Sequence, residues 1–187
     1  ARHHNRSVGR WLSIDTAMKD KDTSDYSAFA VLELTPEYTL QVRSVTHERL
    51  LFPELIRRIE GLATQLNRDG KLRGVVIEDK VSGTSAFQTL AAVAPAWLRP
   101  LLIAFQPSGA KEQRWRQASV WCEKGMVMLP EPGAAAAWLF DFETELFTVP
   151  AATHDDMADA FSQGIIYLEN LLTAGYQSIV RRAIGNQ

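Results

Sequence analysis

Five acidic residues in this sequence lie where carboxylates could act together on a substrate. Asp15 interrupts an alternating apolar stretch, and Glu78 closes the apolar run of residues 75–77. The other three are clustered in the last third of the chain: Asp155, Asp156 and Asp159. Because a charge on an apolar element is costly unless it is paired or bound to a cation, this distribution points to a cation site.

Carboxylate oxygens are hard ligands that suit Mg²⁺ or Mn²⁺ rather than zinc. Two such ions about 3.5–4 Å apart can hold the attacking and leaving oxygens of a phosphodiester displacement. Each acid also has a plainer interpretation. Asp15 and Glu78 could be strand-end charges that meet water, and acids near residue 155 would be favoured at a helix N-terminus. Helix capping explains Asp159 poorly, because it lies a full turn into the helix and shares a face with Asp156.

Hydrophobic periodicity predicts the elements that must position these acids. Strands are expected over residues 11–17, 27–35 and 38–46, joined as an antiparallel meander. A helix from Pro53 to Leu66 follows, and then strands alternate with helices, which favours parallel pairing. The remaining strands are expected over 74–79, 101–105 and 126–129, and the remaining helices over 84–94, 109–124, 134–146 and 155–172. The fold class predicted is α/β, a mixed sheet flanked by helices.

Composition restricts the possible functions. The 187 residues are 46% hydrophobic, enough for one sizeable core. With 20 Lys and Arg against 22 Asp and Glu, any contact with DNA must come from a local basic patch. The single cysteine, Cys122, cannot form an internal disulfide and is expected in the core. No apolar stretch is long enough to span a membrane.

Basic and histidine residues provide further candidates. Residues 109–124 carry a basic set interleaved with Trp115 and Trp121, and we interpret that set as a phosphate-contacting face or, alternatively, as the solvated side of an amphipathic helix. Lys80 could contact a phosphate or neutralise a carboxylate. His154 could shuttle a proton or bind a cation, although most single histidines do neither. The candidate DNA-binding residues are therefore Lys80, Lys111, Arg114, Arg116 and Lys124.

Five motifs, in order, resemble the C-terminal nuclease domain of phage terminase large subunits, in the RNase H-like, RuvC-like superfamily. They are Ser13-Ile-Asp15-Thr-Ala, Ser24-Asp-Tyr-Ser-Ala28, Val76-Ile-Glu78-Asp-Lys80, Glu123-Lys-Gly125 with Met128-Leu-Pro130, and His154-Asp-Asp-Met-Ala-Asp159-Ala. The resemblance covers roughly residues 10–170. It implies an RNase H-like fold and catalytic residues Asp15, Glu78 and Asp156, which would bind two divalent cations, Mg²⁺ or Mn²⁺. Asp155 and Asp159 would be neighbours able to share in the coordination of the metal.

The same resemblance implies a metal-dependent endonuclease of a viral genome-packaging terminase, which cuts concatemeric double-stranded DNA in the cytoplasm of a bacterial host. Its partners would be the ATPase motor domain of the full-length protein, the small terminase subunit and the portal. No phosphate-binding G-x-x-x-x-G-K-[ST] loop occurs, so no ATPase is expected in this chain. We expect a leader over 1–9 from a missing N-terminal region, the nuclease domain over 10–173 and a tail over 174–187. The alternatives are a RuvC-like junction resolvase, a transposase-type nuclease, or a catalytically silent module that binds DNA or a portal.

Overall fold

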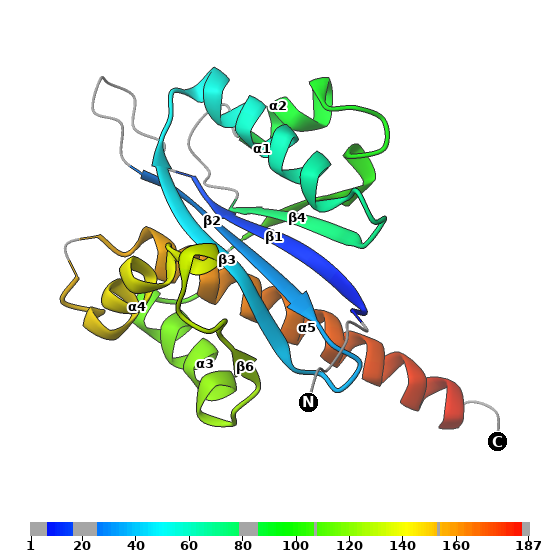
Figure 1. The fold of residues 1–187 in the computed structure, drawn as a ribbon. Coiled ribbons are helices and arrows are strands. Elements are labelled where there is room, and N and C mark those ends of the chain that lie inside the picture. Colours follow the sequence, from blue (N-terminus) through cyan, green and yellow to red (C-terminus); the bar gives the residue numbers. More distant parts are fainter. Residues whose placement is uncertain (1–6, 17–25, 79–85, 107, 153, 185–187) are drawn as a thin grey trace.

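A six-stranded mixed sheet forms the centre of the computed structural model, in the strand order β5-β4-β1-β2-β3-β6 (Figure 1). The structure describes residues 7–16, 26–78, 86–106, 108–152 and 154–184. Strand β1 pairs antiparallel with β2, and β2 antiparallel with β3, while β4, β5 and β6 are added by parallel pairing. The predicted combination of a meander with parallel strands is confirmed.

The elements follow one another without repeats. The strands are β1 (Gly9–Asp15), β2 (Tyr26–Leu34), β3 (Leu40–Arg49), β4 (Leu72–Glu78), β5 (Leu102–Phe105) and β6 (Val127–Met128). The helices are α1 (Phe52–Leu66), α2 (Ala86–Val93), α3 (Lys111–Glu123), α4 (Leu139–Thr148) and α5 (Asp156–Ile184), with short 3-10 helices at Arg99–Leu101 and Ala134–Ala136. No helix in the described ranges combines the length and hydropathy that membrane crossing requires.

Helices cover both faces of the sheet (Figure 1). One face packs on α1 and α2 through a core that contains Leu12, Ile14 and Ile77. The other face packs on α3, α4 and α5 through a core that contains Trp11, Val76 and Phe161. Because side chains alternate along a strand, Ser13 and Asp15 belong to the second face, as do Val76 and Glu78. Both strand-end acids therefore face the layer of α3, α4 and α5.

Two helices differ from the sequence prediction. The alanine-rich stretch expected to begin a helix at residue 134 forms only a 3-10 turn, and α4 starts at Leu139. Helix α5 was expected to end at residue 172, but it continues to Ile184 and projects beyond the sheet (Figure 1). The prediction ended the helix at Leu172, the last residue assigned to its buried stripe, although apolar residues continue at helical spacing through Tyr176, Ile179 and Val180.

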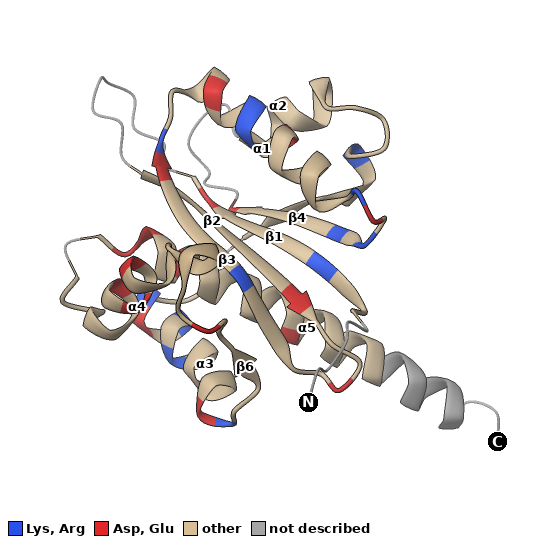
Figure 2. Ribbon diagram, viewed as in Figure 1, with Lys and Arg blue, Asp and Glu red and all other residues tan. Residues whose placement is uncertain are grey.

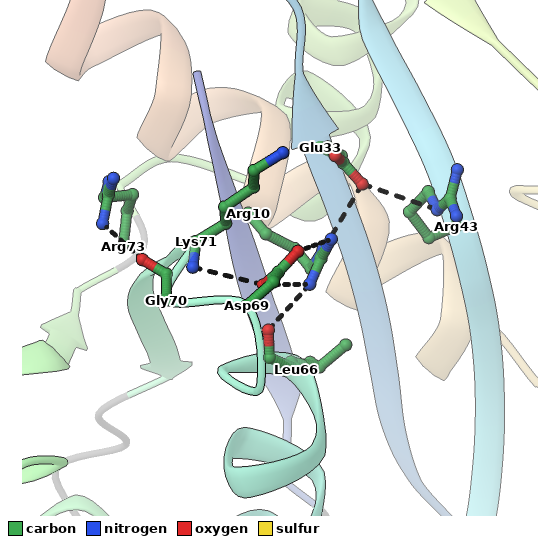
Figure 3. A network of polar contacts seen from close by, with 8 residues as sticks. All are labelled: Arg10, Glu33, Arg43, Leu66, Asp69, Gly70, Lys71 and Arg73. Atoms are coloured by element: carbon green, nitrogen blue, oxygen red, sulfur yellow. Dashed lines mark hydrogen bonds and ion pairs between the residues drawn. The ribbon is translucent and has the colours of Figure 1, made fainter. Parts of the chain in front are cut away.

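A polar network fixes the end of the sheet opposite Asp15 (Figure 3). The guanidinium of Arg10 donates to the carbonyl of Leu66 at 2.7 Å and to the carboxylate of Asp69 at 3.2 and 3.3 Å. It also donates to Glu33, which is almost fully buried and lies 3.5 Å from Arg43. Arg10 thus ties β1 to β2 and to the loop before β4, which holds the register of the central strands.

Replacing Arg10 by Ala should lower the free energy of unfolding by about 2 kcal/mol, because hydrogen bonds to two carboxylates and a helix-terminal carbonyl are lost. Urea unfolding followed by circular dichroism measures this. The matched change Arg73→Ala removes an exposed arginine that bonds only the Gly70 carbonyl in the described structure, and should cost less than about 0.5 kcal/mol. Equal losses in the two variants would show that the network does not stabilise the sheet.

Candidate active site

The site begins at the carboxyl ends of two neighbouring parallel strands. In β1 and β4, Ile14 lies beside Ile77, so the next residues, Asp15 and Glu78, are adjacent and on the same face. Their exposed fractions are only 5% and 8%. Ligands in α/β sheets bind at this edge, outside the carboxyl ends of the strands. Two buried carboxylates side by side, about 5 Å apart by strand spacing, form the base of the site.

Helix α5 is pressed against these two strands by a buried amide. The side chain of Gln163 donates to the carbonyl oxygens of Ile14 and Val76, at 3.1 and 3.3 Å, and lies 3.1 Å from the hydroxyl of Ser13. The next residue, Gly164, allows this close approach, since a Cβ atom there would lie 2.5 Å from Leu32 and 3.0 Å from the Cβ of Ser13. The position of α5 on the sheet is thereby fixed.

This anchor determines where the acids of α5 lie. Helix α5 runs antiparallel to β1 (Figure 1), so the helical turns before Gln163 lie over the residues that follow Ser13. Asp159 precedes Gln163 by four residues, about 6 Å along the helix, and Asp15 follows Ser13 by two, about 7 Å along the strand. Asp159 is therefore level with the two strand-end carboxylates, and Asp156, one turn earlier on the same face, lies just beyond them.

The first turn of α3 supplies two cations to this acidic group. Lys111 lies 2.7 Å from Oδ1 of Asp155 and 2.6 Å from Oδ2 of Asp159, and Arg114 lies 3.7 Å from Glu78. The indole of Trp115 donates to Asp159 at 2.9 Å. In Figure 2, blue segments mark basic residues on α3, the helix that packs against α5. Since one helical turn touches both Asp159 and Glu78, acids from α5 and β4 share one site.

Electrostatic effects of this packing are visible in the pKa values. Burial, followed by the charge of Asp155, raises the pKa of Asp156. Burial also raises the pKa of Asp159, against the opposing hydrogen bond and charge of Lys111. Burial disfavours the charged form of Lys111, but hydrogen bonds to Asp155 and Asp159 outweigh it and raise the pKa of the ammonium. The carboxylates thus repel one another, and a bound cation would relieve the repulsion.

A further buried acid, Glu145 of α4, caps the start of α5. Its carboxylate accepts the backbone N–H of Ala158 at 2.8 Å and is 8% exposed. Burial raises the pKa of Glu145 to about 7, and the charges of Asp156 and Asp155 add to this, whereas the N–H groups of Ala158 and Met157 oppose it. Sequence analysis missed Glu145 because nothing in an amphipathic helix distinguishes a buried capping acid from an exposed one.

The structure groups the predicted acids but not all of the predicted cations. Asp15, Glu78, Asp156 and Asp159 gather at one edge, with Asp155 beside them. Within the described ranges, no three acidic, histidine or cysteine side chains converge closely enough to form a complete metal site. The donor set is nevertheless made of carboxylate oxygens, which fits Mg²⁺ or Mn²⁺.

Several predicted residues lie in surroundings that the sequence did not indicate. Lys111 and Arg114 form ion pairs with carboxylates of the site, and their contact with DNA stays a prediction. Arg116 on α3 and Lys124 just after its end are exposed, and Lys80 lies outside the described residues. Cys122, expected in the core, is exposed, because the buried side of α3 is formed by Ala118 and Trp121.

Comparison with solved structures identifies the fold class. The human cytomegalovirus terminase nuclease domain is similar, with a TM-score of 0.60 and 12% identity, over 90% of this chain and 86% of that domain. The fowlpox virus Holliday junction resolvase has a TM-score of 0.49 and 17% identity, over 87% of this chain and 99% of the resolvase. RuvC of T. thermophilus in complex with a Holliday junction has a TM-score of 0.42 and 11% identity, over 83% of this chain and 90% of RuvC. The first likeness shows that this chain has an RNase H-like fold.

The sequence then places the chain within that class. The terminase RNaseH-like domain family matches residues 12–168, a span that contains Asp15 at the end of β1, strand β4 and the acidic start of α5. The chain therefore belongs to the terminase RNaseH-like domain family, as its motifs predicted. Curated proteins offer no significant match.

The capping role of Glu145 makes a pH-dependent prediction. In the folded chain the Glu145 carboxyl has a pKa of about 7, compared with an ordinary value of 4.5. Stability should therefore fall as pH rises through this window, because the folded state binds more protons than the unfolded state. In Glu145→Gln the amide oxygen still accepts the N–H bonds, and this part of the pH dependence disappears.

Urea unfolding at pH 4.5, 6 and 8, in chelator, measures the difference between wild type and Glu145→Gln. We expect wild type to lose stability relative to the variant as pH rises, and the exposed α4 change Asp141→Asn to leave the wild-type pH dependence unaltered. A difference between wild type and Glu145→Gln that stays constant across the three pH values would mean that Glu145 is ionised throughout.

Proposed function

We propose that this domain is the endonuclease of a viral genome-packaging terminase, which hydrolyses phosphodiester bonds of double-stranded DNA with two divalent cations. The observation that carries the proposal is the pair of buried carboxylates, Asp15 and Glu78, on adjacent strand ends of a terminase RNaseH-like domain. The solved relative with the highest TM-score among those compared above is itself a terminase nuclease domain, which supports the same assignment.

The residues that would hold the cations are Asp15, Glu78, Asp156 and Asp159. Asp15, at the strand end beside Glu78, would hold the cations together with Glu78 and the acids of α5. Asp156 and Asp159 share one face of α5 above it, while Asp155 is held by Lys111 at the side. When bound, the cations would neutralise the charge that develops on the attacking and leaving oxygens.

The protein residues would contribute position and charge. Gln163 fixes the two strand ends under the helix, so the carboxylates have little freedom to separate. While no metal or DNA is bound, the positive charges of Lys111 and Arg114 would reduce the repulsion among the carboxylates. A domain of net charge −2 can attract DNA only through local basic patches. The ATPase motor of the full-length protein would hold DNA near the site and so supply the missing affinity.

Plasmid cleavage tests this function. The purified domain should be inactive in EDTA and active in Mn²⁺ or Mg²⁺, with Zn²⁺ a poor substitute. The changes Asp15→Asn, Glu78→Gln and Asp156→Asn should each reduce cleavage by about 100-fold or more without unfolding the domain. Asp141→Asn, on the exposed side of α4, should cleave like wild type.

Two outcomes would overturn the proposal. Cleavage that persists in excess EDTA would exclude two-metal hydrolysis. DNA binding without cleavage in any divalent cation would identify a silent module. Comparison of Asp155→Asn with Asp159→Asn then identifies which of these acids acts with Asp156, and we expect the larger loss for Asp159→Asn, since it lies level with Asp15.

Lys111 gives a separate prediction about metal binding. Its ammonium is bound by Asp155 and Asp159, so a divalent cation must compete with it. In chelator, Lys111→Gln should lower the free energy of unfolding by about 1 kcal/mol, because the acids then repel without compensation. Mn²⁺ should raise the melting temperature of this variant more than that of wild type.

Differential scanning fluorimetry with and without Mn²⁺ measures both effects, and Lys124→Gln, an exposed change just after the same helix, serves as the control. A Mn²⁺-induced shift in Lys111→Gln that equals the shift in wild type and Lys124→Gln would show that Lys111 does not compete with the cation.

A further inference from the structure

Beside the carboxylates lies a second group of chemically capable residues, gathered around the ring of Tyr26. The His47 ring stacks on Tyr26 with centroids 4.3 Å apart, and the His154 ring meets it edge-on at 5.5 Å. The Arg49 guanidinium carbon lies 4.6 Å from the centroid of the Tyr26 ring. Three segments distant in sequence, the start of β2, the end of β3 and the residue before Asp155, thus meet at one ring. We call Tyr26, His47, Arg49 and His154 the Tyr26 cluster.

The sheet register places the Tyr26 cluster next to the carboxylate site. Asp15 pairs with Ala28, and Ala28 with His47, so Asp15 and His47 are two strands apart on one face, about 10 Å. Two residues further along the same two strands, Tyr26 pairs with Arg49, beyond the end of β1. His154 immediately precedes Asp155 in the chain. The cluster therefore continues the strand-end edge from Glu78 and Asp15 toward β3.

Arg49 differs from the other site-facing arginine. Arg114 lies against the carboxylate of Glu78, whereas Arg49 is exposed and rests on an aromatic ring, with no described carboxylate in ion-pair distance. A ring attracts the flat face of a guanidinium and leaves the N–H donors at its edge free to bind a ligand. The fork of donors in arginine matches the oxygens of a phosphate.

The histidines add donors of the same kind. His154 is exposed, and His47 is half-buried with a covered Nδ1 atom that has no hydrogen-bond partner among the described residues. Because the Nδ1 atom is covered, His47 contributes to the cluster as the ring that stacks on Tyr26. The guanidinium of Arg49 and the exposed imidazole of His154 form a set of donors suited to an anion.

We propose that the Tyr26 cluster binds a backbone phosphate of the DNA strand one or two nucleotides from the bond to be cut. This inference rests on the proposed nuclease function and adds a direction: the strand would cross the sheet edge from Glu78 and Asp15 toward β3. The basic face of α3, whose first-turn cations are bound to carboxylates, would not be the principal contact.

DNA binding without metal tests this subsite independently of cleavage. Fluorescence anisotropy with a short duplex at several salt concentrations, in EDTA, gives both the affinity and the number of phosphate contacts. Arg49→Gln should weaken DNA binding about fivefold to tenfold. It should also lower the slope of log affinity against log salt concentration by the amount expected for about one phosphate contact. Arg57→Gln, the same change at an exposed site on the opposite helical layer, should behave like wild type.

Three further variants separate the role of the cluster from its fold. Tyr26→Phe keeps the ring and should bind DNA like wild type, whereas Tyr26→Ala removes the support of Arg49 and should resemble Arg49→Gln. Arg49→Lys keeps the charge and should retain the salt dependence while losing part of the affinity. Equal affinities and salt slopes in wild type, Arg49→Gln and Arg49→Lys would overturn the proposed subsite.

Cleavage kinetics distinguish this inference from the function on which it rests. In Mn²⁺ under single-turnover conditions, Arg49→Gln should raise the protein concentration needed for half-maximal rate and leave the maximal rate within about twofold. A lower maximal rate with unchanged half-saturation would make Arg49 part of the chemical step and contradict a binding subsite. Absence of cleavage by the wild-type domain would contradict the proposed function, and the anisotropy result would still decide whether the cluster binds DNA.

Discussion

The contact of helix α5 with strands β1 and β4 is the constraint on which the rest of the site depends. The amide of Gln163 bonds the carbonyls of both strands, and Gly164 removes the side chain that would hold the helix away from Leu32 and Ser13. Because parallel pairing places Asp15 beside Glu78, this one contact sets the distance between four carboxylates from three elements. A displaced helix would retain each residue but lose the site.

Carboxylates brought so close need compensating charge, and the chain supplies it from α3. Lys111 binds Asp155 and Asp159, Arg114 approaches Glu78, and Trp115 donates to Asp159. These two cations of α3 are therefore paired with the acidic site. Under the proposal above, phosphate contacts would fall to residues such as Arg49, which rests on a ring instead of a carboxylate. Such a division would reconcile an overall charge of −2 with a substrate as acidic as DNA.

Local patterns predicted much of this structure, while contacts between distant segments escaped them. Alternation and apolar runs located the strands and the mixed sheet, and the acids at residues 15, 78 and 155–159 stood out because charge there contradicts the pattern. Glu145, Gln163 and the partners of Tyr26 gave no such signal, since capping, amide bridging and ring stacking depend on which segments meet in space. The same reason explains why the ion pairs of Lys111 and Arg114 with carboxylates were not predicted. Periodicity reports that a helix has a charged side, but not what faces it.

We infer that the carboxylates of β1, β4 and α5 form one divalent-cation site, and a crystal of the domain soaked in Mn²⁺ would show whether they do, because anomalous scattering locates the ion without reference to activity. We expect anomalous peaks within about 2.5 Å of oxygens of Asp15 and Glu78, with Asp156 or Asp159 completing the ligands and Lys111 displaced from them. Manganese bound elsewhere, with Lys111 still on Asp155 and Asp159, would show that these acids do not form such a site.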